Sequence, residues 1–242
     1  MTTQGILGIA VVIPAHDEAA TIARCVRSVL TAAADVAVPV TVVVALDACT
    51  DGSAAVLDEF GADVLAVEVD VRCVGAARAA GFRRARENYQ QRGWGDAQVW
   101  FATTDADSTV DRSWLRRQLD ADADVVLGVV RIRDRRRMPA EVLRRYLAAY
   151  RAKFRADGRG HDHVHGANMG FRADAYWNVG GFAALPVHED VDLVHRFDAV
   201  GARIARTVDI AVATSARPVG RAAGGFATHL QSLERPAEEE PA

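Results

Sequence analysis

The stretch Ile9-Ala10-Val11-Val12-Ile13 is a continuous apolar run, mostly of β-branched residues. Such a run is typical of a strand that is covered on both faces. Pro14 follows directly, and we expect the strand to end there. Similar runs return at residues 40–44 and 98–102, and stretches with helical periodicity separate them. This alternation predicts an α/β fold with a mostly parallel, Rossmann-like sheet and helices on both faces.

The whole chain divides into elements with this pattern, although the second half is less regular. We expect one domain over residues 1–233, in which the pattern changes near residue 110. Residues 234–242 are rich in Pro, Ala and Glu, which predicts a disordered tail. Strands are expected at 9–13, 40–44, 63–69, 98–102, 124–130 and 203–214. Helices are expected at 21–30, 53–60, 75–88, 139–155, 174–179 and 190–200.

Composition excludes several classes of protein. The 242 residues carry a formal net charge of −3, which argues against binding nucleic acid through bulk charge. Three scattered cysteines are too few for a disulfide framework or a zinc cluster. No apolar run approaches the roughly 20 residues of a membrane span, and the N-terminus lacks the basic start of a signal peptide. We therefore expect a cytoplasmic protein.

Acidic side chains follow the predicted strands. In an open parallel sheet, ligands bind beyond the carboxyl ends of the strands, so these positions are informative. Clustered carboxylates need a compensating cation, because like charges raise each other's pKa. A local interpretation is open for Asp17, Asp47 and Asp51, which could cap helices or form Asx turns. The acidic residues at the strand ends are Asp17, Glu18, Asp47, Asp51, Asp105 and Asp107.

The segment Asp105-Ala106-Asp107 follows a strongly apolar strand. On an extended segment, two carboxylates at positions i and i+2 point the same way. They could together hold Mg²⁺ or Mn²⁺, which prefer oxygen ligands and often share them with phosphates. Two other Asp-x-Asp patterns, at residues 120–124 and 190–192, show that the motif alone is weak. Its position after a buried strand distinguishes the first one.

The run Val11-Val12-Ile13-Pro14-Ala15-His16-Asp17-Glu18 resembles the opening strand and loop of family 2 glycosyltransferases, which have the GT-A fold. Six further segments agree with the family in order and spacing, and together they span about residues 9–201. Each is weak alone, and their shared register makes the resemblance specific. These further segments are residues 47–53, 75–81, 104–107, 166–172, 179–182 and 189–193.

The resemblance implies a nucleotide-diphosphate sugar as donor, with a UDP-sugar favoured and a GDP-sugar also open. It also implies that about residues 1–110 form the nucleotide-sugar-binding half of the domain and about 111–233 the smaller acceptor half. Asp47 would accept a hydrogen bond from the base, and Arg78 would lie near the base or the diphosphate. Asp105 would hold the ribose or the ion, and Asp107 would ligate the Mg²⁺ or Mn²⁺. The nucleotide-site residues implied in this way are Pro14, Asp17, Glu18, Asp47, Asp51, Gly75, Arg78 and Asp105.

The same resemblance implies catalysis by Glu189 and Asp190, with Asp190 as the base that takes the proton of an acceptor hydroxyl. A single attack by that hydroxyl would invert the anomeric centre. A local interpretation is that both carboxylates only favour the positive end of the helix that begins there. The sequence departs from many members because Leu46 precedes Asp47 where they have a second aspartate. No Gln-x-x-Arg-Trp motif follows, which argues against processive polymer synthesis.

Several cationic and imidazole side chains allow two interpretations. His229 could complete the metal shell and Arg221 could pair with the diphosphate, or both could lie in a surface tail. The alternating His161, His163 and His165 could bind a metal, although such histidines are usually solvated. The basic region 131–155 is typical of a solvated helix face, and the alternative is peripheral contact with an anionic membrane or an acidic acceptor.

These observations predict a metal-dependent glycosyltransferase that adds one sugar to an acceptor hydroxyl of unknown identity. Oligomeric state is not predicted. One alternative is a nucleotidyltransferase, which would require a glycine-rich loop with a basic residue after the first strand. Residues 14–18 are Pro-Ala-His-Asp-Glu at that place, which argues against this alternative. The other alternative is a non-catalytic nucleotide-binding module. The presence of both Asp107 and Asp190, the implied metal ligand and base, argues against it.

Overall fold

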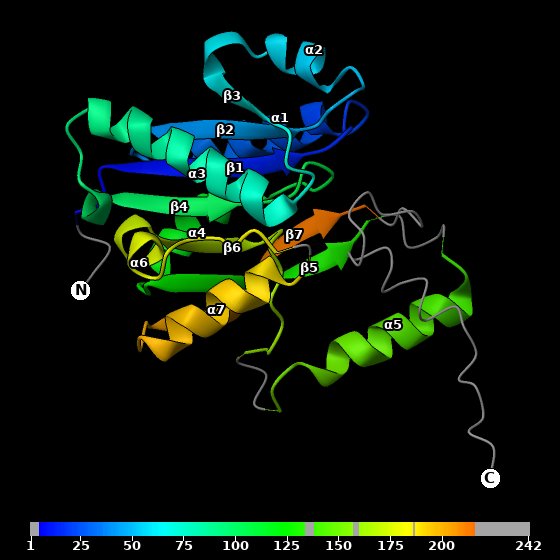
Figure 1. Ribbon diagram of the computed structural model, residues 1–242. Coiled ribbons are helices and arrows are strands. Elements are labelled where there is room, and N and C mark those ends of the chain that lie inside the picture. The colour runs from blue at the N-terminus through cyan, green and yellow to red at the C-terminus, as the bar shows by residue number, and fades with distance from the viewer. Residues whose placement is uncertain (1–4, 134–137, 157–159, 186, 216–242) are drawn as a thin grey trace.

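The computed structural model describes residues 5–133, 138–156, 160–185 and 187–215. One mixed sheet contains the strands β1 (Gly8–Ala15), β2 (Val40–Asp47), β3 (Val64–Val69), β4 (Val99–Thr103), β5 (Val125–Ile132), β6 (Met169–Arg172) and β7 (Ile204–Thr214). Their order is β3-β2-β1-β4-β6-β5-β7 (Figure 1). Only β6 runs antiparallel to its neighbours β4 and β5, and the other described pairs are parallel. The sheet therefore contains strands from both predicted halves.

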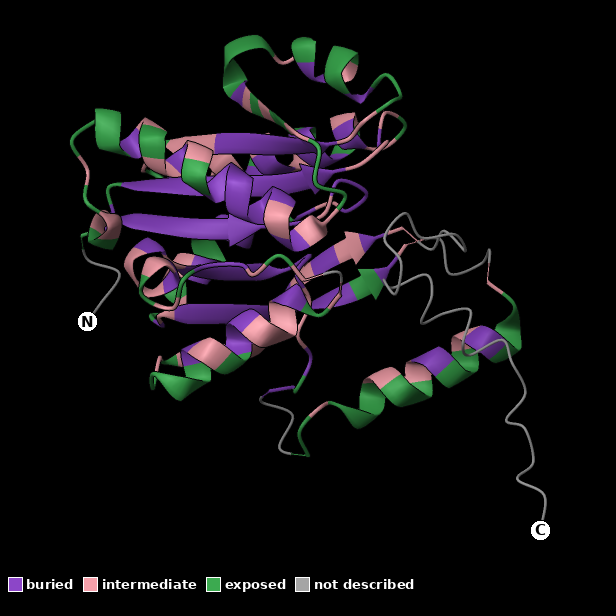
Figure 2. Ribbon diagram, viewed as in Figure 1, coloured by how far each residue is buried: buried purple, intermediate pink, exposed green. Residues whose placement is uncertain are grey.

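Helices cover both faces of this sheet, as the sequence predicts. The helices of the described residues are α1 (Ile22–Ala33), α2 (Ser53–Asp58), α3 (Val74–Gln91), α4 (Trp114–Asp120), α5 (Ala140–Ala152), α6 (Ala173–Asn178) and α7 (Glu189–Ala199). Short 3₁₀ turns occupy Gly61–Asp63 and Asp96–Gln98. Apolar side chains of α1, α2 and α4 pack on one face, and those of α3, α6 and α7 pack on the other. The central strands β1 and β4 between these two layers are buried along their whole length (Figure 2).

The first strand extends further than expected. β1 continues through Pro14 to Ala15, which lie opposite Ala45 and Leu46 of β2. The expectation that Pro14 ends the strand is therefore wrong. Proline lacks one donor but has a φ that suits an extended chain, so its cost near a strand end is a single ladder hydrogen bond. The longer strand carries the loop of residues 16–21 to the same sheet edge as the end of β2.

Two elements were absent from the sequence prediction. The seven-residue α4 places Trp114 and Leu115 in the core. The four-residue β6 begins at Met169, at the end of the stretch that contains the alternating histidines and that the sequence predicts to be a polar loop. β6 forms because Gly170 fits between Ala102 of β4 and Val126 of β5. Its backbone groups find partners on both sides, so long-range pairing decides this strand and local propensity does not.

The segment 138–165 differs from the rest of the molecule. Figure 1 shows α5 standing apart from the helices that cover the sheet. Its inner side contributes Tyr146 to a small cluster with Ile132, packed against Met138, Leu147 and Tyr150. In the described part of the chain, no helix has the length and apolar character that crossing a bilayer requires.

Two histidines of this segment, His161 and His163, are buried, and His165 is half-buried. His161 is fully covered and His163 is 2% exposed, so the prediction that they lie solvated in a polar loop is wrong. The His163 ring stacks on Tyr150 with a centroid distance of 3.8 Å, and His165 stacks on His163 at 5.3 Å. Burial lowers the pKa of His163 to about 4 and that of His165 to about 3. Both imidazoles are therefore neutral at pH 7, and they act as packing groups.

Candidate active site

The loops that follow β1 and β2 are joined by side-chain hydrogen bonds. Asp17, with a left-handed φ of 53°, accepts the backbone N–H groups of Thr50 at 2.6 Å and Asp51 at 3.1 Å. These bonds lower the pKa of Asp17, with the Thr50 N–H contributing most. In return, Asp51 accepts the N–H of Ala19 at 2.9 Å. The carboxylates of Asp17 and Asp51 therefore hold the two loops together at this edge of the sheet.

Asp51 and Glu18 are both connected to Ser53 by hydrogen bonds. Asp51 accepts the backbone N–H of Ser53 at 2.9 Å, which is the Asx-turn geometry of the local interpretation. The Ser53 hydroxyl accepts the N–H of the buried Glu18 at 2.8 Å. Pro14 lies in β1 directly before this loop. Pro14, Asp17, Glu18 and Asp51 thus lie together at one edge of the sheet, and their role in binding a nucleotide stays a prediction.

Asp47 organises a third loop. Its carboxylate is 4% exposed and accepts three backbone N–H groups, from Val71, Arg72 and Cys73, each at 2.8 Å. It thereby fixes the connection between β3 and α3. The Cys73 thiol in turn donates to the carbonyl of Leu185 at 3.1 Å, which ties this loop to the segment before α7. The implied bond from Asp47 to a base stays a prediction, in addition to this structural role.

Arg78 lies at the centre of the candidate site. Its side chain is 2% exposed and reaches from α3 to two carboxylates, Asp105 at 2.5 Å and Glu189 at 3.2 Å. Phe182 lies under the guanidinium at 5.6 Å from the ring centroid. Burial disfavours the charge, but Asp105 and Glu189 outweigh it, so the pKa of Arg78 lies above its usual value. This buried guanidinium therefore connects the segment after β4 with the start of α7.

Glu189 is held as the partner of this guanidinium. It is the first residue of α7 and is 7% exposed. Burial raises its pKa, and the charge of Arg78 opposes that rise. A Cβ added at Gly75 would lie 2.9 Å from the Cβ of Glu189, so only glycine at the start of α3 allows this close approach. Gly75 therefore permits the contact between α3 and α7.

Asp190 lies beside this pair, in the first turn of α7. Its Oδ2 accepts the backbone N–H of Gly166 at 2.7 Å, and its Oδ1 accepts the N–H of Val191 at 2.8 Å. A Cβ added at Gly166 would lie 2.7 Å from a guanidinium nitrogen of Arg78. The glycine thus contacts Arg78 on one side and orients Asp190 on the other. Gly166 is a functional position to which sequence reasoning gave no role, although it opens a segment that resembles the family.

The segment Asp105–Asp107 departs from its expected shape. Residues 106 and 107 form a turn, so the expectation of two parallel carboxylates on an extended segment is wrong. The turn arises where β4 ends, and it directs Asp105 to Arg78. Asp107 instead accepts the hydroxyl of Thr214, at the end of β7, at 3.2 Å. The two carboxylates therefore bind different groups of the protein.

These residues still suit a hard divalent cation. Both donors are carboxylate oxygens, and the Asp105 side chain is 39% exposed. A second group, Asp17, Cys49 and Asp51, has potential ligand atoms within 4.8 Å of one another. It fits Mg²⁺ or Mn²⁺ poorly, because one member is a soft sulfur donor whose pKa is raised by burial. Arg221 and His229 lie outside the described residues.

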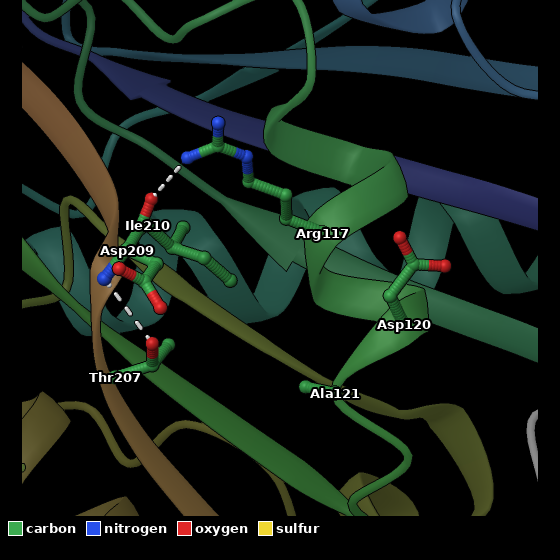
Figure 3. Close-up of a pocket in the computed structure, with 6 residues that line it drawn as sticks. All are labelled: Arg117, Asp120, Ala121, Thr207, Asp209 and Ile210. Carbon is green, nitrogen blue, oxygen red and sulfur yellow. Dashed lines mark hydrogen bonds between the residues drawn. The ribbon is translucent and has the colours of Figure 1, made fainter. Parts of the chain in front are cut away.

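A separate pocket opens between α4 and β7 (Figure 3). Arg117 crosses it to donate to the backbone carbonyl of Asp209. Its lining residues are Arg117, Asp120, Ala121, Thr207, Asp209 and Ile210, and none of these is a predicted site residue. The carboxylate-rich edge described above is therefore the stronger candidate for catalysis.

Comparison with known families decides the wider assignment. The family model described as "Glycosyl transferase family 2" matches residues 10–180, which is more than half of the chain. The chain belongs to glycosyltransferase family 2. A search of curated protein sequences found no match.

Solved structures agree on the fold of this family 2 chain. TarS 1–349 from S. aureus, in complex with UDP-GlcNAc, superposes with a TM-score of 0.64 and 15% identity over 93% of this chain. The mannosyltransferase PcManGT from Pyrobaculum calidifontis, in complex with GDP-Man and Mn²⁺, superposes with a TM-score of 0.65 and 18% sequence identity over 91% of this chain. The match covers 65% and 60% of those chains, respectively, so this chain is the shorter partner. The fold is GT-A, as the sequence predicts.

Proposed function

We propose that this family 2 enzyme transfers one sugar from a nucleotide-diphosphate sugar to an acceptor hydroxyl, with Mg²⁺ or Mn²⁺ as cofactor. The observation that carries the proposal is the buried Arg78, which binds Asp105 after β4 and Glu189 at the start of α7. It places an acidic strand end and the base candidate Asp190 in one contact network. Family membership and the UDP-GlcNAc and GDP-Man in the structural neighbours support the donor class.

The donor side supplies binding and charge balance. Asp105 and Asp107 would hold the divalent ion, which when bound neutralises charge on the diphosphate leaving group. Loops fixed by Asp17, Asp47 and Asp51 would present their backbone and side chains to the nucleotide. Their hydrogen bonds are already made within the protein, so little reorganisation is needed when the donor binds.

The acceptor side supplies the base. The acceptor oxygen attacks the anomeric carbon, the bond from that carbon to the diphosphate oxygen breaks, and the nucleoside diphosphate leaves with the electron pair. Asp190 takes the hydroxyl proton as attack proceeds. The N–H of Gly166 holds the Asp190 carboxylate in one orientation. A single displacement of this kind inverts the anomeric centre.

Glu189 is a positioning residue in this proposal. Its carboxylate pairs with Arg78, is buried and lies one residue before the base. We had expected it to share in catalysis, and its surroundings favour a role in fixing the first turn of α7. Glu189→Gln should therefore lower the rate without changing the shape of the pH–rate profile. Asp190→Asn should change that shape, because it removes the group that takes the proton.

Nucleotide release tests the proposal without knowledge of the acceptor. The full chain is incubated with UDP-GlcNAc or GDP-mannose, with and without Mn²⁺, and free UDP or GDP is measured over time. We expect metal-dependent release from one donor and its loss in Asp107→Ala. Arg117→Gln, in the pocket of Figure 3, is the matched control and should retain release. Absence of both binding and release with each donor would contradict the proposal and favour a non-catalytic module.

A further inference from the structure

The outer side of α5 is a basic face that no step of the proposed reaction uses. Residues 138–156 contain five cationic side chains and one acidic side chain, Glu141. All five cationic residues are exposed. Because the whole chain carries a net charge of −3, this face is a local reversal of charge. We define the basic face of α5 by three residues of the helix, Arg144, Arg145 and Arg151, together with Lys153 and Arg155, which follow directly after it.

The opposite side of the same helix is apolar and anchored. Val142 and Tyr146 are buried, and Leu147 and Tyr150 pack in the same small cluster. The Tyr150 hydroxyl accepts the backbone N–H of Val130 at 2.9 Å, which ties α5 to β5. The helix is therefore oriented by its inner side, and the residues of its other side, including Arg144, Arg145 and Arg151, are exposed. Figure 2 shows this alternation of buried and exposed residues along α5.

We propose that the basic face of α5 binds the surface of an anionic lipid bilayer. A concave pocket would suit a discrete anionic ligand, whereas these cations lie along the convex outer side of a helix. Thirteen helical residues span about 20 Å, which matches an extended flat surface. Small exposed residues, Ala148, Ala149 and Ala152, lie between the long cationic side chains and allow the helix axis to approach closely.

The attachment is electrostatic. The large exposed apolar side chains in the described residues are Leu7, Val71 and Val200, and none belongs to α5. The face therefore lacks the apolar wedge that inserts an amphipathic helix into the acyl region. Lys and Arg near an anionic surface each strengthen binding by about five-fold at low ionic strength, and salt screens the effect. Arg144 and Arg145 share Glu141, and Arg155 pairs with Asp162 at 3.4 Å, which reduces the contribution of these three cations.

The location of α5 gives this binding a consequence for catalysis. After α5, the chain passes through the stacked His163 and His165 to Gly166, whose N–H binds Asp190. A membrane held by α5 would lie near the side of the molecule that carries the base candidate. If the proposed function holds, the acceptor hydroxyl then belongs to a lipid headgroup or a lipid-linked saccharide.

Vesicle flotation tests this proposal on the full chain. Vesicles of phosphatidylcholine alone are compared with phosphatidylcholine vesicles in which about one lipid in three is the anionic phosphatidylglycerol. We expect flotation with the anionic vesicles at 50 mM salt and its loss at about 500 mM, where the Debye length falls well below 10 Å. Equal flotation with both vesicles, or none with either, would overturn the proposal.

Two variants with the same change in charge locate the surface. The α5 variant carries Arg144→Gln, Arg145→Gln, Arg151→Gln and Lys153→Gln. The control carries Arg24→Gln, Arg27→Gln, Arg83→Gln and Arg92→Gln, all exposed and outside α5. Glutamine preserves helix propensity. We expect the α5 variant to lose at least about 100-fold in vesicle affinity and the control to change less than about five-fold.

Equal losses in both variants would show that net charge alone matters, and would overturn the assignment to α5. Binding of soluble polyphosphate without flotation would assign the face to a soluble polyanion instead, and would also overturn it. Circular dichroism at 222 nm confirms that both variants retain the helix content of the wild type. Nucleotide release in vesicle-free buffer is measured in parallel, so failure of the membrane proposal stays distinct from failure of the proposed transferase activity.

Discussion

The donor-side loops and the segment 138–165 are fixed by different forces. At the donor side, the carboxylates of Asp17, Asp47 and Asp51 accept backbone N–H groups from neighbouring loops. In the segment 138–165, rings of Tyr150 and His163 stack under a helix that stands off the sheet. Charged hydrogen bonds are directional and specify one loop geometry, whereas stacked rings tolerate more change in orientation. The donor side is therefore the more rigid half, and the acceptor side is the half open to variation.

Arg78 connects these two regions, because it binds Asp105 on one side and Glu189 on the other. The comparison predicts that substitutions divide by region. Changes on the donor side should affect nucleotide binding, and changes on the acceptor side should affect turnover. Asp190→Asn tests that division directly, and three further substitutions, in order of decreasing expected effect, test the contacts that join and build the two regions.

Asp190→Asn should give the largest loss. Removal of a general base slows transfer by about 10²–10⁴-fold, while the amide keeps the size of the side chain. Nucleotide release from the donor measures the rate, and calorimetry with UDP or GDP and Mn²⁺ measures donor binding. Donor affinity should stay within about three-fold of the wild type, because Asp190 lies on the acceptor side. Near-normal turnover would rule out Asp190 as the base.

Arg78→Ala should destabilise both regions together. It leaves Glu189 buried without its cation, and breaking such a pair costs about 3 kcal/mol in the free energy of unfolding. Urea denaturation measures this loss. Arg78→Lys keeps the charge but not the two-sided geometry, and should recover about half of the stability. A fully stable alanine variant would show that the two regions are joined by other contacts.

Gly166→Ala should cost about 2 kcal/mol, because the added methyl overpacks the guanidinium of Arg78 at 2.7 Å. Gly52→Ala is the matched control, since a Cβ there meets its nearest neighbour at 3.9 Å. The control should cost less, about 0.5–1 kcal/mol, because Gly52 is the N-cap of α2 and alanine is a poorer N-cap than glycine. Thermal denaturation of both variants distinguishes close packing at Gly166 from a general effect of replacing glycine.

His163→Phe should have the smallest effect, visible only in acid. Burial lowers the pKa of His163 to about 4 from 6.5, so the folded state binds fewer protons than the unfolded state between these values. The wild type therefore has its full stability above pH 6.5 and loses it as the pH falls towards 4. Between pH 7 and 5.5 this loss should be about 1 kcal/mol greater in the wild type than in the variant. Identical pH dependence would show that His163 is not buried in solution.

The sequence allowed the central sheet to be predicted because its strands are continuous apolar runs. β1, β2 and β4 were each located within a few residues, since a strand covered on both faces has no polar side to obscure the pattern. β6 and α4 were not predicted. Both are short, and β6 exists because β4 and β5 offer backbone partners that no local pattern encodes.

The candidate site was predicted in outline and differs in its contacts. Strand-end carboxylates could be identified from position alone, because parallel strands bring their carboxyl ends to one edge. That Arg78 pairs with Glu189, 111 positions away in sequence, depends on how α3 packs against α7. The burial of His163 likewise depends on Tyr150, which follows from the docking of α5. Sequence spacing carries no information on such distant pairs.

A crystal structure of the full chain with UDP or GDP and Mn²⁺ tests the central claim most directly, since that claim places both halves around one site. We predict that the diphosphate and the metal lie against Asp105 and Asp107, with the Asp190 carboxylate lining the same cavity. A nucleotide bound elsewhere, such as between α4 and β7 (Figure 3), or an Asp190 side chain facing a different cavity, would contradict the account.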